Sequence, residues 1–326
     1  MFRVPCCTLD SETHAKGEAK RNLMAENSRR PSIEHTLHVE GHTLFALALN
    51  PESAGQPIVL LHGIAGSTRF WSGDHVAAFL EHGPCYALSL PGHYPARFPT
   101  GFRKEMITPD MMARVLAAAI RQLVGDQPVT LIGHSTGGFA ALAIAAHYPH
   151  AVRRVISISG FAQGRWAGTL GLLQRLARQG PAGQALYRLI FPVGRISPAM
   201  FLRAWSVCAA DLRTFYAYPD LKACTNGYYS DFTRLDLDAM IQYFSVMPDI
   251  DISPILPRIA APTLAVTGDK DPTVPPAQAR LIADRVPQAK LALIVGAGHM
   301  LFAERPAEYR RVLNEWLHRM TTSCVE

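Results

Sequence analysis

From residue 33 onward, short apolar runs alternate with longer segments whose apolar residues recur every three or four positions. Runs of this length, bounded by Gly or Pro, are typical of buried strands, and the longer spacing is typical of amphipathic helices. Because parallel strands need a crossover connection, the alternation predicts an α/β fold with a mostly parallel sheet. The predicted strands lie in SIEHTLHVEGHTLFALAL (an antiparallel hairpin), QPIVLLHG, PCYALSLPGH, QPVTLIGHS, RRVISISG, APTLAVTGDKD and AKLALIVGAGH.

Helices are predicted between these strands. The segment TPDMMARVLAAAIRQLV is amphipathic, and Pro109 suits the first turn of a helix. Further helices are predicted over 68–80, from the end of QPVTLIGHS to about residue 147, over 276–285 and over 306–320.

The alternation stops between residues 161 and 255, where only helical patterns occur, such as Leu170, Leu173 and Leu176. This gap predicts an α-helical insertion within one α/β domain. The predicted organisation is therefore a mobile tail over 1–30, an α/β core over 31–160 and 256–326, and the insertion between them. The tail is expected to be mobile because it is polar and lacks a period.

The composition supports a globular domain. Apolar residues make up 48% of the 326 residues and charged residues 18%, which predicts a sizeable core. The net charge of +6 is scattered along the chain, so we expect no nucleic-acid partner and at most a weak affinity for anionic membranes or acidic partners.

Targeting and redox signals point to a cytoplasmic protein. No stretch of about 18 apolar residues is present, and the first 20 residues lack the apolar core of a secretory signal. The six cysteines show neither C-x-x-C nor a Cys/His metal spacing, so we expect reduced thiols and no metal site. The cysteines are Cys6, Cys7, Cys85, Cys208, Cys224 and Cys324.

A serine lies between glycines at the end of a predicted buried strand. Gly133-His134-Ser135-Thr136-Gly137 fits G-x-S-x-G, the nucleophile elbow, in which a sharp strand-to-helix turn exposes the serine hydroxyl. Glycines two residues before and after the serine leave room for that turn. The backbone N–H of the next residue then lies at a helix N-terminus, where negative charge is stabilised.

A serine nucleophile needs a base and a carboxylate that orients it. His299 follows the last predicted strand, at the sheet edge that also carries Ser135. Asp271, after the preceding strand, is the preferred carboxylate because it lies farther into the loop and a proline follows it. Asp269 and Asp251 remain alternatives.

A second oxyanion donor is expected from the loop HGIAGS after the first parallel strand. The backbone N–H of Ile64 is the candidate, together with that of Thr136. His62 either braces this loop or contacts substrate, and the residues favour neither role.

Together, these residues resemble the α/β-hydrolase superfamily, specifically its serine hydrolases with a helical cap. The resemblance covers about residues 33–320 and rests on LLHGIAGS, GHSTGG, TGDKDPTVP and GAGHMLFAERP, in that order. It implies an eight-stranded, mostly parallel sheet with helices on both faces, and a cap over 161–255. It also implies a Ser135/Asp271/His299 triad. Dehalogenases and epoxide hydrolases of this fold carry Asp at the nucleophile position, so the serine disfavours both activities.

The expected reaction is hydrolysis of a carboxylic ester or thioester through an acyl-enzyme intermediate. No G-x-G-x-x-G or P-loop occurs, and no cofactor is expected. The many aromatic residues of 161–255 predict an apolar small-molecule acyl group, free or attached to a carrier. Candidate pocket residues are His62, Trp166, Met300 and Leu301.

Two other functions are compatible with the same residues. The triad could cleave a carbon–carbon bond or transfer the acyl group to an acceptor other than water. Alternatively, the pocket could serve a non-catalytic ligand receptor. The sequence does not indicate an oligomeric state.

Overall fold

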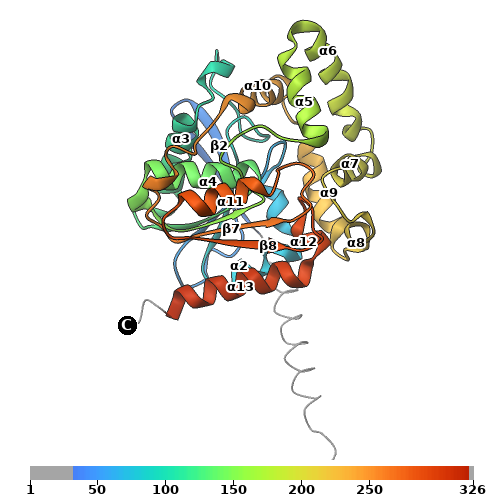
Figure 1. Cartoon of the computed structure of the whole chain (residues 1–326). Helices are drawn as coiled ribbons and strands as arrows, with labels where there is room; N and C mark the ends of the chain where they lie inside the picture. The colour runs from blue at the N-terminus through green and yellow to red at the C-terminus, as the bar shows by residue number, and fades with distance from the viewer. Residues whose placement is uncertain (1–31, 323–326) are drawn as a thin grey trace, which may run out of the picture.

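An eight-stranded sheet forms the centre of the protein in the computed structural model, which describes residues 32–322 (Figure 1). The predicted tail and Cys6, Cys7 and Cys324 lie outside the described residues. In spatial order, the strands are β1 (Ile33–Val39), β2 (His42–Ala48), β4 (Cys85–Leu88), β3 (Ile58–Leu61), β5 (Val129–His134), β6 (Val152–Ile158), β7 (Thr263–Gly268) and β8 (Ala289–Ile294).

The strand pairing explains where a ligand site can form. β2 pairs antiparallel with β1 and β4, and all other neighbours in the sheet pair in parallel. β3 and β5 are buried at every position, which accounts for their unbroken apolar runs. The chain moves outward from β3 in both directions, to β4 on one side and to β5 on the other. Such a switch point creates a crevice at the carboxyl ends of the strands.

Helices cover both faces of the sheet. In Figure 1, α4 (Thr136–His147) and α11 (Ala277–Arg285) lie above β7 and β8, whereas α2 (Ala77–Leu80) and α13 (Pro306–Thr322) lie below them. Each face has its own buried apolar cluster, one around Phe139 and the other around Phe79 and Leu313. The predicted fold class is therefore confirmed.

The helix α3 (Pro109–Val124) begins where the sequence predicts. Pro109 is its first residue, and the backbone N–H of Met111 donates to Thr108 Oγ1 at 3.1 Å. The prediction of one helix over 68–80 is wrong. The chain instead forms two 3-10 turns, η1 (Thr68–Ser72) and η2 (Asp74–Val76), before the short α2, because the backbone of Gly73 is extended (φ −97°, ψ 177°).

The chain between β6 and β7, residues 159–262, is here called the inserted segment. Its contacts fix it to the loops at the sheet edge, since the hydroxyls of Tyr228 and Tyr243 donate to the carbonyls of Ala65 and Pro91, both at 2.8 Å. Its helices are α5 (Gly168–Arg178), α6 (Gly180–Ile190), α7 (Pro198–Ser206), α8 (Leu212–Ala217), α9 (Leu221–Phe232) and α10 (Leu237–Val246). The small helix α12 (Leu301–Glu304) lies beside α8 in Figure 1.

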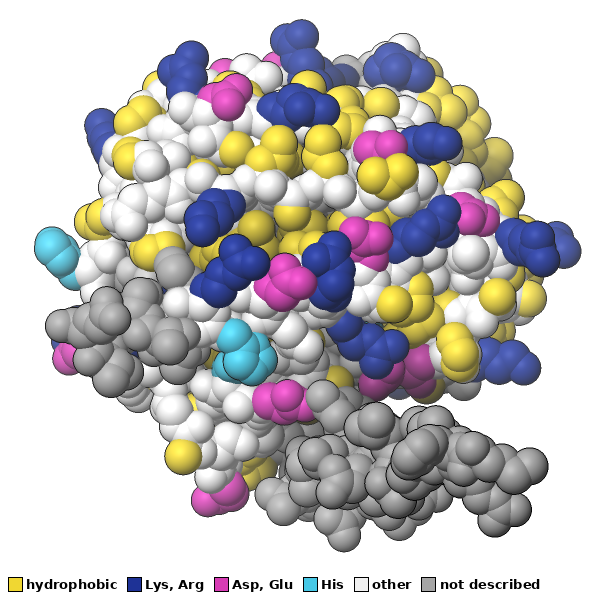
Figure 2. Space-filling view, turned by 60° about the horizontal axis from the view of Figure 1, so that its bottom comes forward, with side chains coloured by type: hydrophobic (Ala, Val, Ile, Leu, Met, Phe, Trp, Pro, Cys, Tyr) yellow, Lys and Arg dark blue, Asp and Glu magenta, His cyan; other side chains and the backbone are white. Residues whose placement is uncertain are grey.

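Charged side chains are dispersed on the face shown in Figure 2, where basic, acidic and apolar groups alternate and form no single basic stripe. Within residues 32–322, no helix has the length and apolar character that crossing a bilayer requires.

Candidate active site

Ser135 lies at the sharp turn between β5 and α4. Its backbone adopts φ 55° and ψ −117°, a conformation that residues other than glycine rarely adopt. The neighbouring strand holds it there, because the backbone N–H of Ser135 donates to the carbonyl of Ile158 in β6 at 2.8 Å. The next residue, Thr136, begins α4, so its N–H has no acceptor within the helix.

The two glycines of the motif have a steric cause. A Cβ on Gly133 would lie 2.1 Å from the carbonyl oxygen of Gly137, and a Cβ on Gly137 would lie 2.1 Å from that of Leu61. Both distances are far below a permitted contact. The turn therefore needs glycine at both positions, as the sequence predicts.

Asp271 and His299 form a buried pair beside this turn. The Nδ1–H of His299 donates to Asp271 Oδ2 at 2.7 Å, and both side chains are almost fully buried. The other carboxylate oxygen accepts the backbone N–H groups of Thr273 and Val274, at 2.8 and 2.9 Å. Because Nδ1 carries the proton, a neutral His299 has its lone pair on Nε2, the atom a general base uses.

The two alternative carboxylates, Asp269 and Asp251, bond to other partners than His299. Asp269 is exposed and accepts the backbone N–H of Gly296 at 2.6 Å. Asp251 is also exposed and accepts from Gln163 and Ser253. Only Asp271, of the three candidates, contacts His299.

The loop after β3 reaches the same turn. A Cβ on Gly63 would lie 3.1 Å from the Cβ of Ser135, so the backbone around Ile64 passes directly beside the serine. His62 braces this loop: its Nδ1–H donates to the carbonyl of Gly63 at 2.8 Å, and its Nε2 accepts from the backbone N–H of Leu90 at 3.1 Å.

His134 supports the loop that carries His299. Its Nε2–H donates to the carbonyl oxygen of His299 at 3.1 Å, and its ring stacks on Phe70. Burial is the main cause that lowers the pKa of His134 well below its usual value, and the nearby His299 lowers it further. The ring is therefore neutral.

A cavity of about 310 Å³ opens above Ser135 and His299, which both line it. Its wall is almost entirely apolar and comes mainly from the inserted segment. Apolar side chains in the wall include Phe70, Leu170, Leu173, Phe191, Phe201, Trp205, Tyr228, Phe232 and Phe244.

Ile64, the predicted oxyanion donor, lines this cavity. Of the four residues predicted to form the pocket, Met300 also lines it, and the other three do not. His62 braces its own loop, Trp166 packs between Phe161 and Phe244, and Leu301 is buried in the core.

Sequence reasoning did not single out the main wall residues as contacts. Phe201 and Trp205, and likewise Tyr228 and Phe232, are four residues apart, so each pair lies on one face of its helix. That spacing was a usable signal, but it does not distinguish a core face from a cavity wall.

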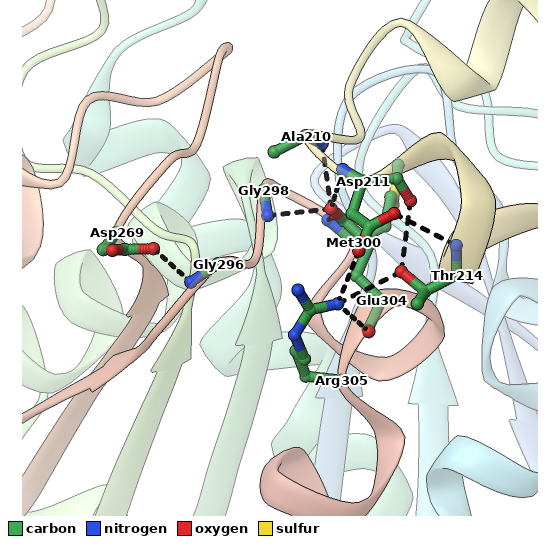
Figure 3. A network of polar contacts seen from close by, with 9 residues as sticks. All are labelled: Ala210, Asp211, Thr214, Asp269, Gly296, Gly298, Met300, Glu304 and Arg305. Atoms are coloured by element: carbon green, nitrogen blue, oxygen red, sulfur yellow. Dashed lines mark hydrogen bonds and ion pairs between the residues drawn. The ribbon is translucent and has the colours of Figure 1, made fainter.

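Glu304 was also missed, although it joins the inserted segment to the loop that carries His299 (Figure 3). It is 1% exposed, and its carboxylate accepts the backbone N–H groups of Ala210 and Asp211 (2.8 Å each), Gly298 (3.0 Å) and Met300 (3.2 Å). The first two residues belong to the inserted segment, and the last two flank the candidate base.

A second contact makes the same connection, because the N–H of His299 donates to the carbonyl of Cys208 at 3.0 Å. Burial raises the pKa of Glu304 against the opposing effect of these hydrogen bonds. Glu304 is therefore a positioning residue that ties the loop of His299 to the inserted segment. Its signal in the sequence was a single acidic residue in the apolar run MLFAE.

Within residues 32–322, no group of three or more His, Cys, Asp or Glu side chains is arranged to hold a metal ion.

The fold and these motifs together define an α/β hydrolase. The α/β hydrolase fold family matches residues 56–306, and the chain belongs to this family. It is 26% identical over 269 residues to the pyrrolizixenacetamide deacetylase of Xenorhabdus hominickii, covering 82% of this chain and 92% of the relative. It is 23% identical over 262 residues to a putative esterase/lipase of Haemophilus influenzae, covering 80% of this chain and 83% of the relative.

Solved structures show the same fold. The esterase from Exiguobacterium antarcticum superimposes with a TM-score of 0.67 at 20% identity, covering 87% of this chain and 98% of that one.

Four buried histidines predict that the folded protein loses stability as the pH falls. Burial lowers the pKa of His62 to about 4 and those of His75 and His93 to about 3, and it lowers that of His134 strongly. The unfolded chain binds protons at these groups below about pH 6.5, so the free energy of unfolding falls as the pH drops. Each histidine contributes up to about 1.4 kcal/mol per pH unit.

Thermal unfolding followed by circular dichroism between pH 7.5 and 5 should show a steep fall in Tm below pH 6.5. His93→Gln should flatten the fall, and His38→Gln, at an exposed position, should not. A Tm that stays constant from pH 7 to pH 5 would contradict this prediction.

Glu304→Gln should weaken the connection between the base loop and the inserted segment. One amide oxygen cannot accept four N–H groups, and the new NH₂ faces donors, so we expect a loss of about 2 kcal/mol in unfolding free energy. We also expect kcat for an activated ester to fall at least about tenfold, with a smaller change in KM. Urea unfolding and steady-state kinetics measure both quantities.

The matched control is Glu308→Gln, which changes an exposed glutamate paired with Arg311. It should leave kcat and stability almost unchanged. Equal effects of the two substitutions would refute the positioning role of Glu304.

Proposed function

We propose that the protein is a serine hydrolase that cleaves a carboxylic ester or thioester of an apolar acyl group. The single observation that carries this proposal is a buried Asp271–His299 hydrogen bond next to a strained Ser135, at the base of an apolar cavity. A fixed imidazole beside a serine at a helix N-terminus is the arrangement that acyl transfer requires.

In the proposed mechanism, His299 Nε2 accepts the proton of the Ser135 hydroxyl as the oxygen attacks the carbonyl carbon. The resulting imidazolium is stabilised by Asp271. The oxyanion accepts hydrogen bonds from the N–H groups of Ile64 and Thr136, each worth about 3 kcal/mol in such sites. Collapse of the intermediate expels the alcohol or thiol, which takes the proton from His299. Water activated by His299 then releases the acid.

The reaction class is supported by the relatives, among which are a deacetylase and a putative esterase/lipase. The preference for an apolar acyl group is supported by the cavity wall, whose side chains near the serine are aromatic and aliphatic. We propose that the inserted segment serves as the cap of this site.

Substitution of the nucleophile tests the mechanism directly. Ser135→Ala should abolish labelling by a fluorophosphonate probe and lower kcat at least about 10⁴-fold, because no other group can form the acyl-enzyme. Ser230→Ala, at an exposed serine of α9, should label like the wild type. Persistent labelling of the Ser135→Ala protein would eliminate Ser135 as the nucleophile.

The two neighbouring aspartates provide a matched pair. Asp271→Asn should lower kcat about 10³- to 10⁴-fold, since the imidazole loses its orienting carboxylate. Asp269→Asn should change kcat by less than about threefold. The assignment of the acid fails if the second substitution is the more damaging.

The cavity predicts a chain-length preference. For p-nitrophenyl esters, kcat/KM should rise from acetate to medium-chain acyl groups by roughly fourfold per methylene, because each buried methylene contributes about 0.8 kcal/mol. Leu173→Trp, which fills part of the wall, should shift the optimum to shorter chains. An optimum at acetate in the wild type would contradict the proposed acyl specificity.

A further inference from the structure

Exposed apolar side chains are concentrated on the inserted segment. Of the 13 large hydrophobic side chains exposed in the described part of the chain, nine lie between residues 172 and 216. They are Leu172, Leu186, Leu189, Ile190, Val193, Ile196, Val207, Leu212 and Tyr216.

Five of these side chains form one continuous stripe, which we call the apolar ridge: Leu186, Leu189, Ile190, Val193 and Ile196. Leu186, Leu189 and Ile190 lie on α6, Val193 lies on the 3-10 turn η5 (Phe191–Arg195), which continues α6 directly, and Ile196 is the residue that ends this turn. Apart from the adjacent pair Leu189 and Ile190, each is three or four residues from the next. Residues at this spacing share a helix face. Leu189 is 71% exposed and Ile196 is 72% exposed, so the ridge faces solvent.

The ridge is continuous with the cavity above Ser135. Ile190 and Val193 are 38% and 39% exposed, yet both also line that cavity. An apolar molecule at the ridge therefore has an apolar path to the site.

The stretch of sequence that carries the ridge has only basic charged residues. Residues 161–210 contain six arginines and no aspartate or glutamate. Arg178 and Arg188 pair with Asp249 and Asp238, from outside that range. Arg175 and Arg203 are exposed, and neither has an acidic partner among the ion pairs of the described residues.

We propose that the apolar ridge docks on the surface of an anionic phospholipid bilayer. Aliphatic side chains that enter the interface, flanked by arginines that meet anionic headgroups, are the combination that holds a helix in the plane of a membrane. A protein partner is less well matched, because protein interfaces are enriched in aromatic residues and the ridge is purely aliphatic. The docking is independent of the chemistry at Ser135. Its consequence, that the acyl chain enters the cavity from the bilayer, rests on the proposed function.

Sedimentation with vesicles tests the docking. The full-length protein should bind vesicles of equimolar phosphatidylglycerol and phosphatidylcholine, and bind pure phosphatidylcholine vesicles at least about tenfold less tightly. Added salt should weaken the binding. Leu189→Asp/Ile196→Asp should reduce partitioning at least about tenfold, and Arg175→Gln/Arg203→Gln about tenfold.

The matched control is Leu291→Asp/Val295→Asp, which places the same charges at two exposed apolar positions of β8 and the loop after it. It should bind vesicles like the wild type. All variants should hydrolyse a short, soluble p-nitrophenyl ester at the wild-type rate, which shows that they are folded. Vesicle binding without any ester hydrolysis in the wild type would support docking and refute the proposed function alone.

Three results would overturn the docking. The first is the absence of wild-type binding to anionic vesicles, and the second is an equal loss of binding in the control variant. The third is a wild-type dimer in size-exclusion chromatography that becomes monomeric in Leu189→Asp/Ile196→Asp without any vesicle binding, because the ridge would then be covered by a second copy of the chain.

Discussion

The strained turn at Ser135 is the constraint on which the site depends. A non-glycine residue at φ 55° costs on the order of 1–3 kcal/mol and persists only where its surroundings enforce it. Here the three central strands do so: β6 accepts the N–H of Ser135, β5 leads into the turn, and β3 leaves no space beside Gly137. The sheet thereby holds a hydroxyl at a helix N-terminus, where negative charge is stabilised.

Burial of polar groups gives the rest of the site its rigidity. The Asp271–His299 pair and the four hydrogen bonds to Glu304 lie away from water, where a satisfied network is strong and an unsatisfied one is costly. Glu304 contacts both the loop of His299 and the inserted segment. The position of the candidate base and the shape of the cavity are therefore set by the same contacts.

The inserted segment presents apolar residues both to the cavity and to solvent. Phe201, Trp205 and Phe232 face the cavity, whereas Leu189 and Ile196 face solvent. A helix that only covers a core would keep its outer face polar. The departure from that rule suggests that the segment shapes the pocket and also meets an apolar surface.

The order of strands and helices, the elbow at Ser135 and the loops of Asp271 and His299 were determined by the sequence, because periodicity and glycine spacing act locally. The broken helix at Gly73, the pocket wall and the role of Glu304 were decided by tertiary structure. Whether an aromatic side chain at helical spacing lines a cavity or fills a core depends on what packs against it. A glutamate in an apolar run shows its purpose only when the backbone N–H groups of residues more than 90 positions away reach it.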